Sequence, residues 1–333
     1  MPTPPLISII IVSWNSAKHL PHCLDCLALQ TLQDFEVILV DNGSLDGGTN
    51  DLEQKYSQLD LHVERLPSNI GFAVANNRGA QIACGKWLAL LNADAFPEPN
   101  WLESLLEAAK RHPEFSFFTS RQIQANQPEL LDGAGDEYHT SGLAWRRFYN
   151  YPSEKYGFNE EEVFGACGAA ATYLRDDFLG VGGFDETYFS YFEDVDLSFR
   201  LRLLGKRCLY VPQAVVNHIG SASSGKISDF VIYHGHRNLV WTYFKNMPGA
   251  LLWWYLPLHL LMNLFFMLSF ASKGKGATIL RAKIDAFSRL PAIIRTRRQI
   301  QSSRTATYPE IRQVMSKELF APYWASRQRR KRI

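Results

Sequence analysis

The sequence predicts an α/β fold in which a mostly parallel sheet is flanked by helices and followed by a helical, membrane-associating C-terminal region. Apolar runs without polar alternation recur between residues 6 and 91, as in strands that are buried on both faces. Amphipathic stretches of helix length separate these runs. A stretch of 27 residues without Asp, Glu, Lys or Arg then follows Lys245 and precedes a basic tail, which predicts the membrane-associating region.

Strands and helices are expected to alternate along the first third of the chain. The expected strands are 6–13, 35–40, 61–66 and 87–91, and the expected helices are 17–29, 49–59, 72–83 and 99–111. This alternation indicates parallel strands joined by helical crossovers. Ligands of such sheets bind beyond the carboxyl ends of the strands.

A less regular stretch follows the last of these helices. Between Gln122 and Val163, glycine, aromatic and charged residues mix, which predicts a loop-rich insertion over a site. The regular pattern returns at Phe164–Leu174, and a helix is expected over Asp194–Leu204. A short strand, RCLYVP, then leads to His218.

Residues 250–270 form an apolar segment that is long enough to span a bilayer. Trp253 and Trp254 lie near one end, where interfacial aromatic residues are common. His259 and Asn263 are unusual in a simple span, and basic flanks tend to stay cytoplasmic. We therefore expect a re-entrant or in-plane helix at the cytoplasmic face of the inner or plasma membrane. A buried helix of a globular domain is the alternative.

The basic tail is expected to contact anionic lipid. Residues 273–333 carry sixteen Lys or Arg and three Asp or Glu, whereas residues 1–272 have a net charge of −11. Apolar residues such as Ile284 and Phe287 interleave with the basic ones, which favours an amphipathic surface helix over a nucleic-acid-binding arm. The short apolar run near the start has no basic region before it, so we expect no signal peptide.

Candidate ligand-binding residues follow the expected strands. Asp41 ends one strand, where a carboxylate can accept hydrogen bonds from a sugar hydroxyl or a base N–H. The first strand is followed by SWNS, which lacks the glycine-rich turn that dinucleotide-binding sheets require. An Asx-turn within DNGS is the alternative role of Asp41.

Asn92 and Asp94 are candidate metal-binding residues at another strand end. Side chains two residues apart point to one face, and hard oxygen ligands suit Mg²⁺ or Mn²⁺. Only one of the two side chains is anionic, so an ion would need another ligand. Separately, the His218 ring, which follows a strand and precedes a Gly/Ser loop, could be a metal ligand. A helix cap for Asp94 and a structural role for His218 are the alternatives.

Glu193, Asp194 and Asp196 form a cluster of like charge at the start of an expected helix. Such a cluster can raise the pKa of one carboxyl group, as a general base requires. Acidic residues also favour the first turn of a helix, and Arg200 and Arg202 offer partners further along it.

These motifs together resemble family 2 glycosyltransferases of the GT-A fold. The resemblance runs from about Ile7 to Lys245 and rests on ISIIIVSWN, VILVDNGSLDG, NIGFAVANNRG, LLNADA, GACGAAATYLRDDFLGVGGFDETYFSYFEDVDLSFRLRLLG and NHIGSAS. The later HGHRNLVWTYFKNMP resembles the rhamnosyltransferase-like subgroup. Each motif alone is weak, but six in the right order are highly specific.

The resemblance implies a role for each motif. It implies nucleotide contacts at Ser13, Asn15, Asp41, Asn69, Gly71, Phe72, Asn77 and Asn92. It implies metal ligands at Asp94 and His218, a catalytic base at Asp194 with Glu193 beside it at the acceptor, and an acceptor-side loop around Cys167 and Gly168. We extend it to Arg237, which we expect near a lipid-linked diphosphate. The family usually has Asp where this chain has Asn92, so a metal site here has one carboxylate, and His218 could offset that loss.

The resemblance implies an inverting glycosyltransferase that depends on Mn²⁺ or Mg²⁺. We expect residues 1–225 to form the GT-A catalytic domain and residues 226–333 the helical region. The expected reaction moves a sugar, L-rhamnose from dTDP-rhamnose, from a nucleotide-diphosphate donor to a lipid-linked or polysaccharide acceptor in cell-envelope glycan synthesis.

Two alternatives stand beside this function. A nucleotidyltransferase normally has a glycine-rich, basic turn after the first strand, and SWNS lacks both features. A catalytically silent GT-A module that binds membranes or glycans is the other alternative, and the presence of Asp94, Asp194 and His218 argues against it.

Overall fold

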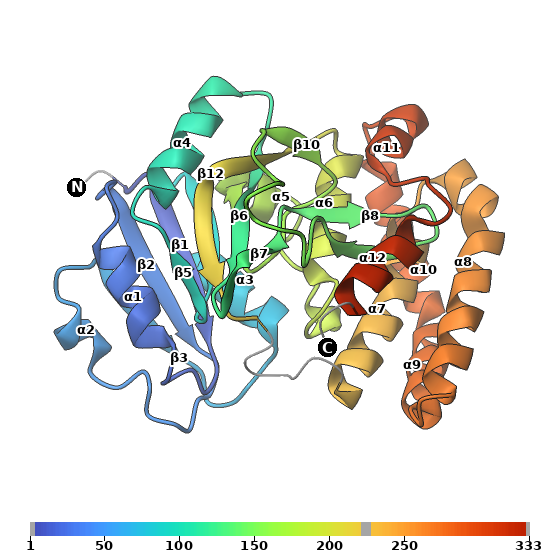
Figure 1. Cartoon of the computed structure of the whole chain (residues 1–333), viewed down its shortest axis with the longest axis horizontal. Coiled ribbons are helices and arrows are strands. Elements are labelled where there is room, and N and C mark those ends of the chain that lie inside the picture. Colours follow the sequence, from blue (N-terminus) through green and yellow to red (C-terminus); the bar gives the residue numbers. More distant parts are fainter. Residues whose placement is uncertain (1–3, 221–227, 331–333) are drawn as a thin grey trace.

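The computed structural model describes residues 4–220 and 228–330. Figure 1 shows a central sheet with helices around it, and the C-terminal helices lie together at one side of the sheet domain. The predicted α/β class, with a mostly parallel sheet and a helical C-terminal region, is confirmed. The expected boundary between residues 225 and 226 and the end of the NHIGSAS motif lie outside the described residues.

The main sheet has ten strands. Eight of them lie in the order β10-β12-β6-β11-β4-β1-β2-β3, while β5 pairs with β12 and β7 pairs with β6. β4, β1, β2 and β3 are parallel, as are β12 and β6, and β11 runs antiparallel between β4 and β6. The strands of this sheet are β1 Ile7–Ser13, β2 Phe35–Asp41, β3 Leu61–Arg65, β4 Trp87–Asn92, β5 Ala95–Pro97, β6 Phe117–Gln124, β7 Gln127–Gly133, β10 Glu161–Val163, β11 Ala170–Leu174 and β12 Cys208–His218.

Helices cover both faces of the sheet, which explains why the strands are apolar without alternation. In β1, Ile9 and Ile11 pack in a core with α1 and α4, whereas Ile10 packs in a second core with α3 and α6. The helices of this part are α1 Leu20–Ala28, α2 Leu52–Lys55, α3 Phe72–Ile82, α4 Trp101–Arg111, α5 Arg175–Gly180, the 3₁₀ helix η1 Glu186–Tyr188 and α6 Glu193–Leu203. The helix expected over 49–59 is reduced to α2, because Asp51 has a left-handed φ of 53° and delays its start.

The loop-rich insertion expected between Gln122 and Val163 is wrong in part. This segment contains β7, β10 and a separate hairpin of β8 Asp136–Tyr138 and β9 Ala144–Arg146. Three of these strands have only three residues each, which is too short for an alternating pattern to emerge. The strand expected before His218 is also longer than predicted, because β12 continues through a register shift to His218 itself.

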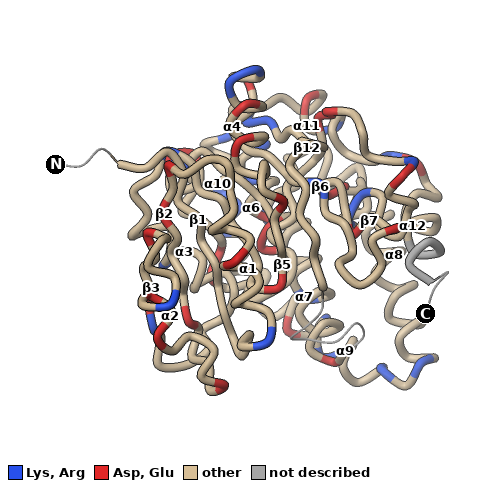
Figure 2. Tube along the Cα trace, turned by 60° about the vertical axis from the view of Figure 1, so that its left-hand side comes forward, with Lys and Arg blue, Asp and Glu red and all other residues tan. Residues whose placement is uncertain are grey.

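The C-terminal helices follow the sheet domain, and α7 packs against α6. They are α7 Asp229–Asn246, α8 Gly249–Ala271, α9 Gly276–Ser288, α10 Leu290–Ser302, α11 Tyr308–Val314 and α12 Ala321–Arg330. Helix α8 coincides with the expected apolar segment, and among the described residues it alone is long and apolar enough to cross a membrane. No Lys, Arg, Asp or Glu interrupts the trace of α8 (Figure 2).

Candidate active site

Strand ends bring the predicted site residues to one edge of the sheet. Ser13 at the end of β1 lies beside Asp41 at the end of β2, and Asn92 ends β4 on the other side of β1. Asp94 immediately precedes β5, whose Ala95 pairs with His218 at the end of β12. Residues far apart in the chain therefore meet beyond the carboxyl ends of the parallel strands, as the sequence predicts.

Asp41 is buried and shapes the turn that follows β2. Its Oδ1 accepts a hydrogen bond from the Ser44 backbone at 2.9 Å, and its Oδ2 accepts one from the Thr49 hydroxyl. Burial raises the pKa of Asp41, but these hydrogen bonds and the nearby Arg65 outweigh burial and lower it. The Asx-turn role is thus present in the structure, and a contact to a nucleotide base would use the remaining lone pairs of an ionised carboxylate.

Other predicted nucleotide-binding residues organise the loops around the strand ends. Asn15 has a left-handed φ of 52°, and its Oδ1 accepts from the Leu45 backbone at 2.9 Å. Asn69 Oδ1 accepts from the Gly71 backbone at 2.9 Å. Asn77 instead joins α3 to the segment before η1, because its side chain bonds both the N–H and the C=O of Phe184. In this structure Asn77 supports the fold.

Gly71 and Phe72 connect the predicted nucleotide-binding loop to the segment before α6. Gly71 has a φ of +94°, and a Cβ there would lie 2.7 Å from the Phe189 ring. The Phe72 N–H donates to the Phe189 carbonyl at 2.8 Å. Phe189, Tyr191 and Phe192 all have left-handed φ values of 64° to 69°, which are rare for bulky residues. Strain of this kind persists where the surrounding structure holds it, often at functional sites.

Asn92, Asp94 and His218 converge as a possible metal site. His218 Nε2 lies 3.4 Å from Asp94 Oδ1 and 3.3 Å from Asn92 Nδ2. Two neighbouring ligands of an octahedral ion at roughly 2.1 Å are about 3 Å apart, so Asp94 and His218 are spaced as ligands of one ion. A carboxylate oxygen beside an imidazole nitrogen is a donor set that fits a divalent cation of the Mn²⁺ type.

Asp132, the penultimate residue of β7, binds the other ring nitrogen of His218. This role was not predicted from the sequence. The Asp132 Oδ2 accepts from His218 Nδ1 at 2.7 Å and also pairs with Arg146 of β9. Burial lowers the pKa of His218, but the carboxylates of Asp132 and Asp94 raise it to about 8. Without an ion the ring is therefore mainly protonated at neutral pH, and a metal would replace the proton on Nε2. The Asp132 carboxylate on Nδ1 keeps Nε2 directed at Asp94 in either state.

No local pattern distinguishes Asp132 from the other acidic residues of the irregular segment. It reaches His218 because β6 pairs with β7 on one edge and with β12 on the other. Arg146 is also placed by strand pairing. It lies in β9 of the β8–β9 hairpin, beside Asp132 and within electrostatic reach of Asp194. Only the strand pairing brings these two residues to His218.

Asp194 lies in the first turn of α6 and faces the predicted acceptor-side loop. Its Oδ2 accepts from the Gly168 backbone at 3.0 Å. Possible ligand atoms of Asp136, Cys167 and Asp194 all lie within 4.8 Å of one another. Burial raises the pKa of Cys167 to about 12, so its thiol stays protonated and is a poor nucleophile at neutral pH. The geometry thus places a half-buried carboxylate beside the loop that is expected to bind the acceptor.

Glu193 and Asp194 occupy different environments although they are adjacent. Glu193 is buried, and its Oε2 has no hydrogen-bond partner among the described residues. Burial, with the nearby charge of Asp194, raises the pKa of Glu193 well above its ordinary value. The neutral form of Glu193 is therefore favoured, and Asp194 is the better placed of the two to accept a proton.

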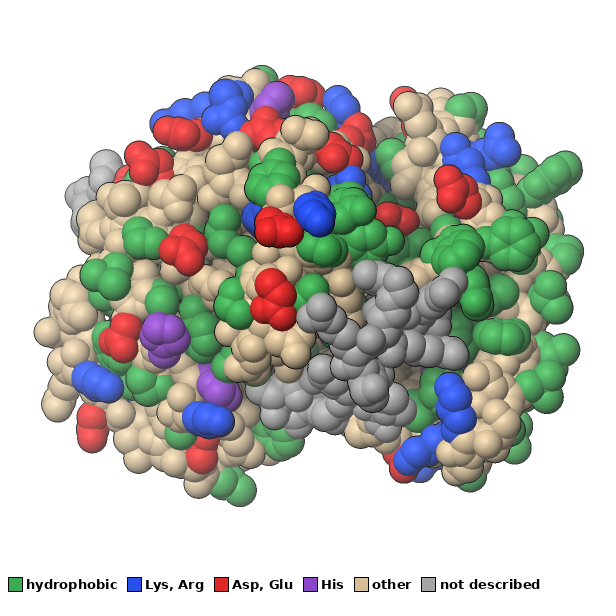
Figure 3. Space-filling view, viewed as in Figure 1, with side chains coloured by type: hydrophobic (Ala, Val, Ile, Leu, Met, Phe, Trp, Pro, Cys, Tyr) green, Lys and Arg blue, Asp and Glu red, His purple; other side chains and the backbone are tan. Residues whose placement is uncertain are grey.

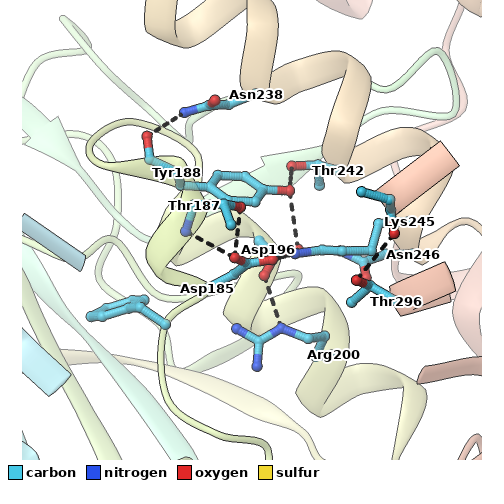
Figure 4. Close-up of polar contacts among 12 residues, drawn as sticks. Asp185, Thr187, Tyr188, Asp196, Arg200, Asn238, Thr242, Lys245, Asn246 and Thr296 are labelled. Carbon is cyan, nitrogen blue, oxygen red and sulfur yellow. Dashed lines mark hydrogen bonds and ion pairs between the residues drawn. The ribbon is translucent and has the colours of Figure 1, made fainter. Parts of the chain in front are cut away.

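Asp196, the third carboxylate of this cluster, has a structural role. Its carboxylate accepts from Arg200 Nε at 2.8 Å and from Asn246 Nδ2 at 2.7 Å, and it pairs with Lys245 Nζ at 2.7 Å (Figure 4). Lys245 also pairs with Asp185, which precedes η1. This buried network fixes α6, which carries Asp194 at its start, to α7.

Arg237 of α7 binds protein groups in this structure. Its Nη2 donates to the Tyr188 carbonyl at 3.1 Å and its Nε donates to Asn238 at 2.9 Å. The guanidinium also lies 4.2 Å from the centre of the Trp241 ring. A contact with a lipid-linked diphosphate stays a prediction.

Comparisons with known proteins show the family and the fold of the chain. The family model "Glycosyl transferase family 2" matches residues 8–180. An N-acetylglucosaminyl-diphospho-decaprenol L-rhamnosyltransferase of Mycobacterium tuberculosis is 30% identical over 282 residues, which cover 76% of this chain and 88% of that protein. A PGL/p-HBAD biosynthesis glycosyltransferase of Mycobacterium bovis is 42% identical over 95 residues, or 27% of this chain and 36% of that protein.

Solved structures share the fold at low sequence identity. GalNAc-T7 with UDP, GalNAc and Mn²⁺ has a TM-score of 0.59 at 20% identity, covering 73% of this chain and 48% of that one. Staphylococcus aureus TarS 1–349 with UDP-GlcNAc has a TM-score of 0.57 at 16% identity, covering 89% of this chain and 90% of that one. These likenesses support the GT-A fold. By its family match and its mycobacterial relative, the chain belongs to glycosyl transferase family 2 and is a glycosyltransferase.

Proposed function

We propose that this protein is an inverting, metal-dependent transferase that moves L-rhamnose from dTDP-rhamnose to a lipid-linked acceptor in cell-envelope glycan synthesis. The proposal is supported by one observation above the others: Asp194 faces the Gly168 loop at the same sheet edge at which Asp94 and His218 converge. The relative from M. tuberculosis, which is named for rhamnose transfer to a lipid-linked N-acetylglucosaminyl diphosphate, supports the choice of sugar and acceptor class.

Asp194 is the proposed base. It accepts the proton of the acceptor hydroxyl as the oxygen attacks the anomeric carbon. The Gly168 N–H bond holds its carboxylate in one orientation. A double displacement would need a second carboxylate as nucleophile, whereas a direct displacement needs none. A single displacement inverts the anomeric centre, which is why we propose inversion.

Asp94 and His218, with Asn92 beside them, are the residues that would hold the divalent cation, Mn²⁺ or Mg²⁺. When bound, the cation neutralises the charge that develops on the departing nucleoside diphosphate. Asp132 keeps the His218 ring in the orientation that presents Nε2, and Arg146 offsets the charge of Asp132. The site therefore has one carboxylate ligand, in keeping with Asn92 at a position where the family usually has Asp.

We assign the chemistry to residues 1–225 and a membrane contact at the cytoplasmic face to residues 226–333. The exposed apolar helix α8 supports this location, because a polyprenyl-linked acceptor resides in a bilayer. The other predicted nucleotide contacts, at Ser13, Asn15, Asp41 and the loop of Asn69 to Phe72, are proposed to bind the donor.

A donor panel tests the function. Purified protein in detergent is mixed with thymidine-, uridine- and guanosine-diphosphate sugars and Mn²⁺ or Mg²⁺, and nucleoside diphosphate release is followed with and without chelator. We expect chelator-sensitive release from dTDP-rhamnose that a polyprenyl-diphosphate sugar acceptor stimulates. Release from another donor would change the assigned sugar. Absence of release from every donor with acceptor present would contradict the proposal.

A further inference from the structure

Helix α8 presents one continuous apolar stripe to the surroundings of the protein. Its exposed residues recur every three or four positions, so they share one side of the helix. They are Ala250, Trp253, Trp254, Pro257, Leu260, Leu261, Leu264, Phe265, Leu268 and Ala271. Trp254 is 78% exposed and Leu261 is 61% exposed. Figure 3 shows hydrophobic side chains gathered over α8 along the right-hand edge of the molecule.

The opposite side of α8 is bonded to the rest of the protein by polar groups. His259 is buried, and its Nδ1 bonds the carbonyl of Ser141 in the β8–β9 hairpin at 2.8 Å. Its ring stacks on Tyr243 of α7 with centroids 3.9 Å apart. Asn263, one turn further along, bonds the ammonium of Lys283 in α9. His259 and Asn263, which are unusual in a simple span, thus attach α8 to the rest of the protein.

These attachments exclude a helix that is surrounded by lipid. If α8 stood across a bilayer, the β8–β9 hairpin at Ser141 and the Lys283 ammonium would lie beside its middle, near the bilayer centre. Charged groups and irregular backbone are strongly disfavoured at that depth. A helix that lies along the surface exposes only its stripe to lipid and leaves the hairpin and Lys283 on the protein side.

The charges and aromatic residues on and near α8 indicate what the stripe contacts. No charged residue lies between Lys245 and Lys273, so nothing on α8 opposes contact with lipid. Exposed basic residues follow the helix, such as Lys273 and Arg281, and residues 273–333 are strongly basic. Trp253 and Trp254 are the residue type that partitions to the headgroup region. An apolar side with basic neighbours fits an anionic bilayer.

We infer that the exposed stripe of α8 docks into the headgroup region of an anionic bilayer with the helix axis in the membrane plane, without crossing it. This inference builds on the membrane contact proposed above and specifies its surface and orientation. The docking surface lies on the side of α8 away from the hairpin that carries Arg146 toward the proposed active site. Docking therefore places the catalytic domain on the membrane surface that holds a lipid-linked acceptor.

Flotation with vesicles tests the surface. The full chain is mixed with vesicles of phosphatidylcholine alone or with half phosphatidylglycerol, and the variant Leu261→Glu/Phe265→Glu is compared with the wild type. Both side chains are more than half exposed, so the fold should survive. We expect the wild type to float with the anionic vesicles and the variant to lose at least tenfold in binding. The matched control, Leu29→Glu/Ile82→Glu, changes two exposed apolar residues of the sheet domain and should float as the wild type does.

Probe depth tests the orientation. Cys84, the exposed native cysteine, is replaced by Ser, and single cysteines at Trp254, Leu261 and Leu268 carry a fluorophore. Quenchers attached at shallow or deep positions of the lipid chains then report depth. We expect all three probes to be shallow and equal in depth. A probe at 261 that is deep between two shallow ends would indicate a spanning helix and overturn the inference.

Two further outcomes would also overturn it. Flotation of the Leu261→Glu/Phe265→Glu variant equal to that of the wild type would exclude the stripe as the docking surface. A lipid-free dimer that this variant converts to a monomer, with flotation unchanged, would assign the stripe to a second copy of the chain. Nucleoside diphosphate release is measured on the same samples, so that a failure of docking is distinguished from a failure of the proposed function.

Discussion

Replacing Asp132 with Asn should weaken metal binding although Asp132 is not a proposed ligand. Asp132 is buried and accepts the Nδ1–H of His218 at 2.7 Å, which presents Nε2 toward Asp94. In Asp132→Asn, the amide either accepts the same bond without a charge or turns its NH₂ toward Nδ1. The second arrangement puts the ring proton on Nε2, where it blocks metal binding.

The magnitude follows from the type of hydrogen bond that is lost. A bond to a charged group contributes about 1.5–3 kcal/mol and a neutral one about 1 kcal/mol, a difference of roughly 0.5–2 kcal/mol. Loss of the charge beside Arg146 adds to this in the same direction, because the guanidinium then repels the cation more strongly. The hydrogen-bond difference alone corresponds to roughly 2–30-fold in affinity. With the lost charge beside Arg146 added, we expect the affinity for Mn²⁺ to fall about 10–100-fold, which is the usual range for the loss of such a partner.

Electron paramagnetic resonance of free Mn²⁺ measures this affinity without reference to turnover. Glu160→Gln is the matched control, since Glu160 also bridges a histidine, His112, and an arginine, Arg111, at a site away from Asp94. The control should keep the affinity of the wild type. An Asp132→Asn protein that is folded by circular dichroism and binds Mn²⁺ as tightly as the wild type would refute the reasoning.

Three further predictions follow from the site and its supports. Asp194→Asn should lower transfer about 10²–10⁴-fold with nucleotide affinity unchanged in a calorimetric titration, and unchanged turnover would contradict its role as base. Gly71→Ala should weaken donor binding, seen as a raised KM, because the added Cβ would meet the Phe189 ring; an unchanged KM would show that the loop adapts. Burial raises the pKa of Asp185, but Lys245 and Thr187 outweigh burial and lower it to about 2 from 3.8, a stabilisation of about 2 kcal/mol. That stabilisation is present above pH 4 and lost as the pH falls to 2, so urea unfolding should show Asp185→Asn to be less stable at pH 7 by about this amount and less sensitive to acid.

The sequence by itself determined the parallel strands β1 to β4 of the central sheet. The run ISIIIVS is apolar at successive positions because helices cover both faces of β1, and that pattern is local to the strand. The position of the turn residues after these strands is predictable as well, because the carboxyl ends of parallel strands lie at one edge of the sheet. The sequence therefore predicts Asp41, Asn92 and Asp94 at one edge of the sheet, and Asp41 and Asn92 do end the two strands that flank β1.

Local sequence could not reveal which aspartate of the cluster at the start of α6 is a candidate base and which is structural. Asp194 and Asp196 are two positions apart, yet one faces the Gly168 loop and the other is buried among Arg200 and residues of α7. Which of them is free to act depends on the packing of α7, a contact between elements distant in the chain. The sequence left both roles open for this cluster.

Tertiary structure alone decided which residues surround the proposed metal site and which side of α8 is left for the proposed membrane contact. Asp132 and Arg146 reach His218 through the pairing of short strands that carry no periodic signal. Helix α8 is apolar on nearly all sides, so its composition does not separate a span from a surface helix. The bonds of His259 and Asn263 to the hairpin and to α9 separate them, because a hydrogen-bonded polar side must face protein and leaves one side for lipid.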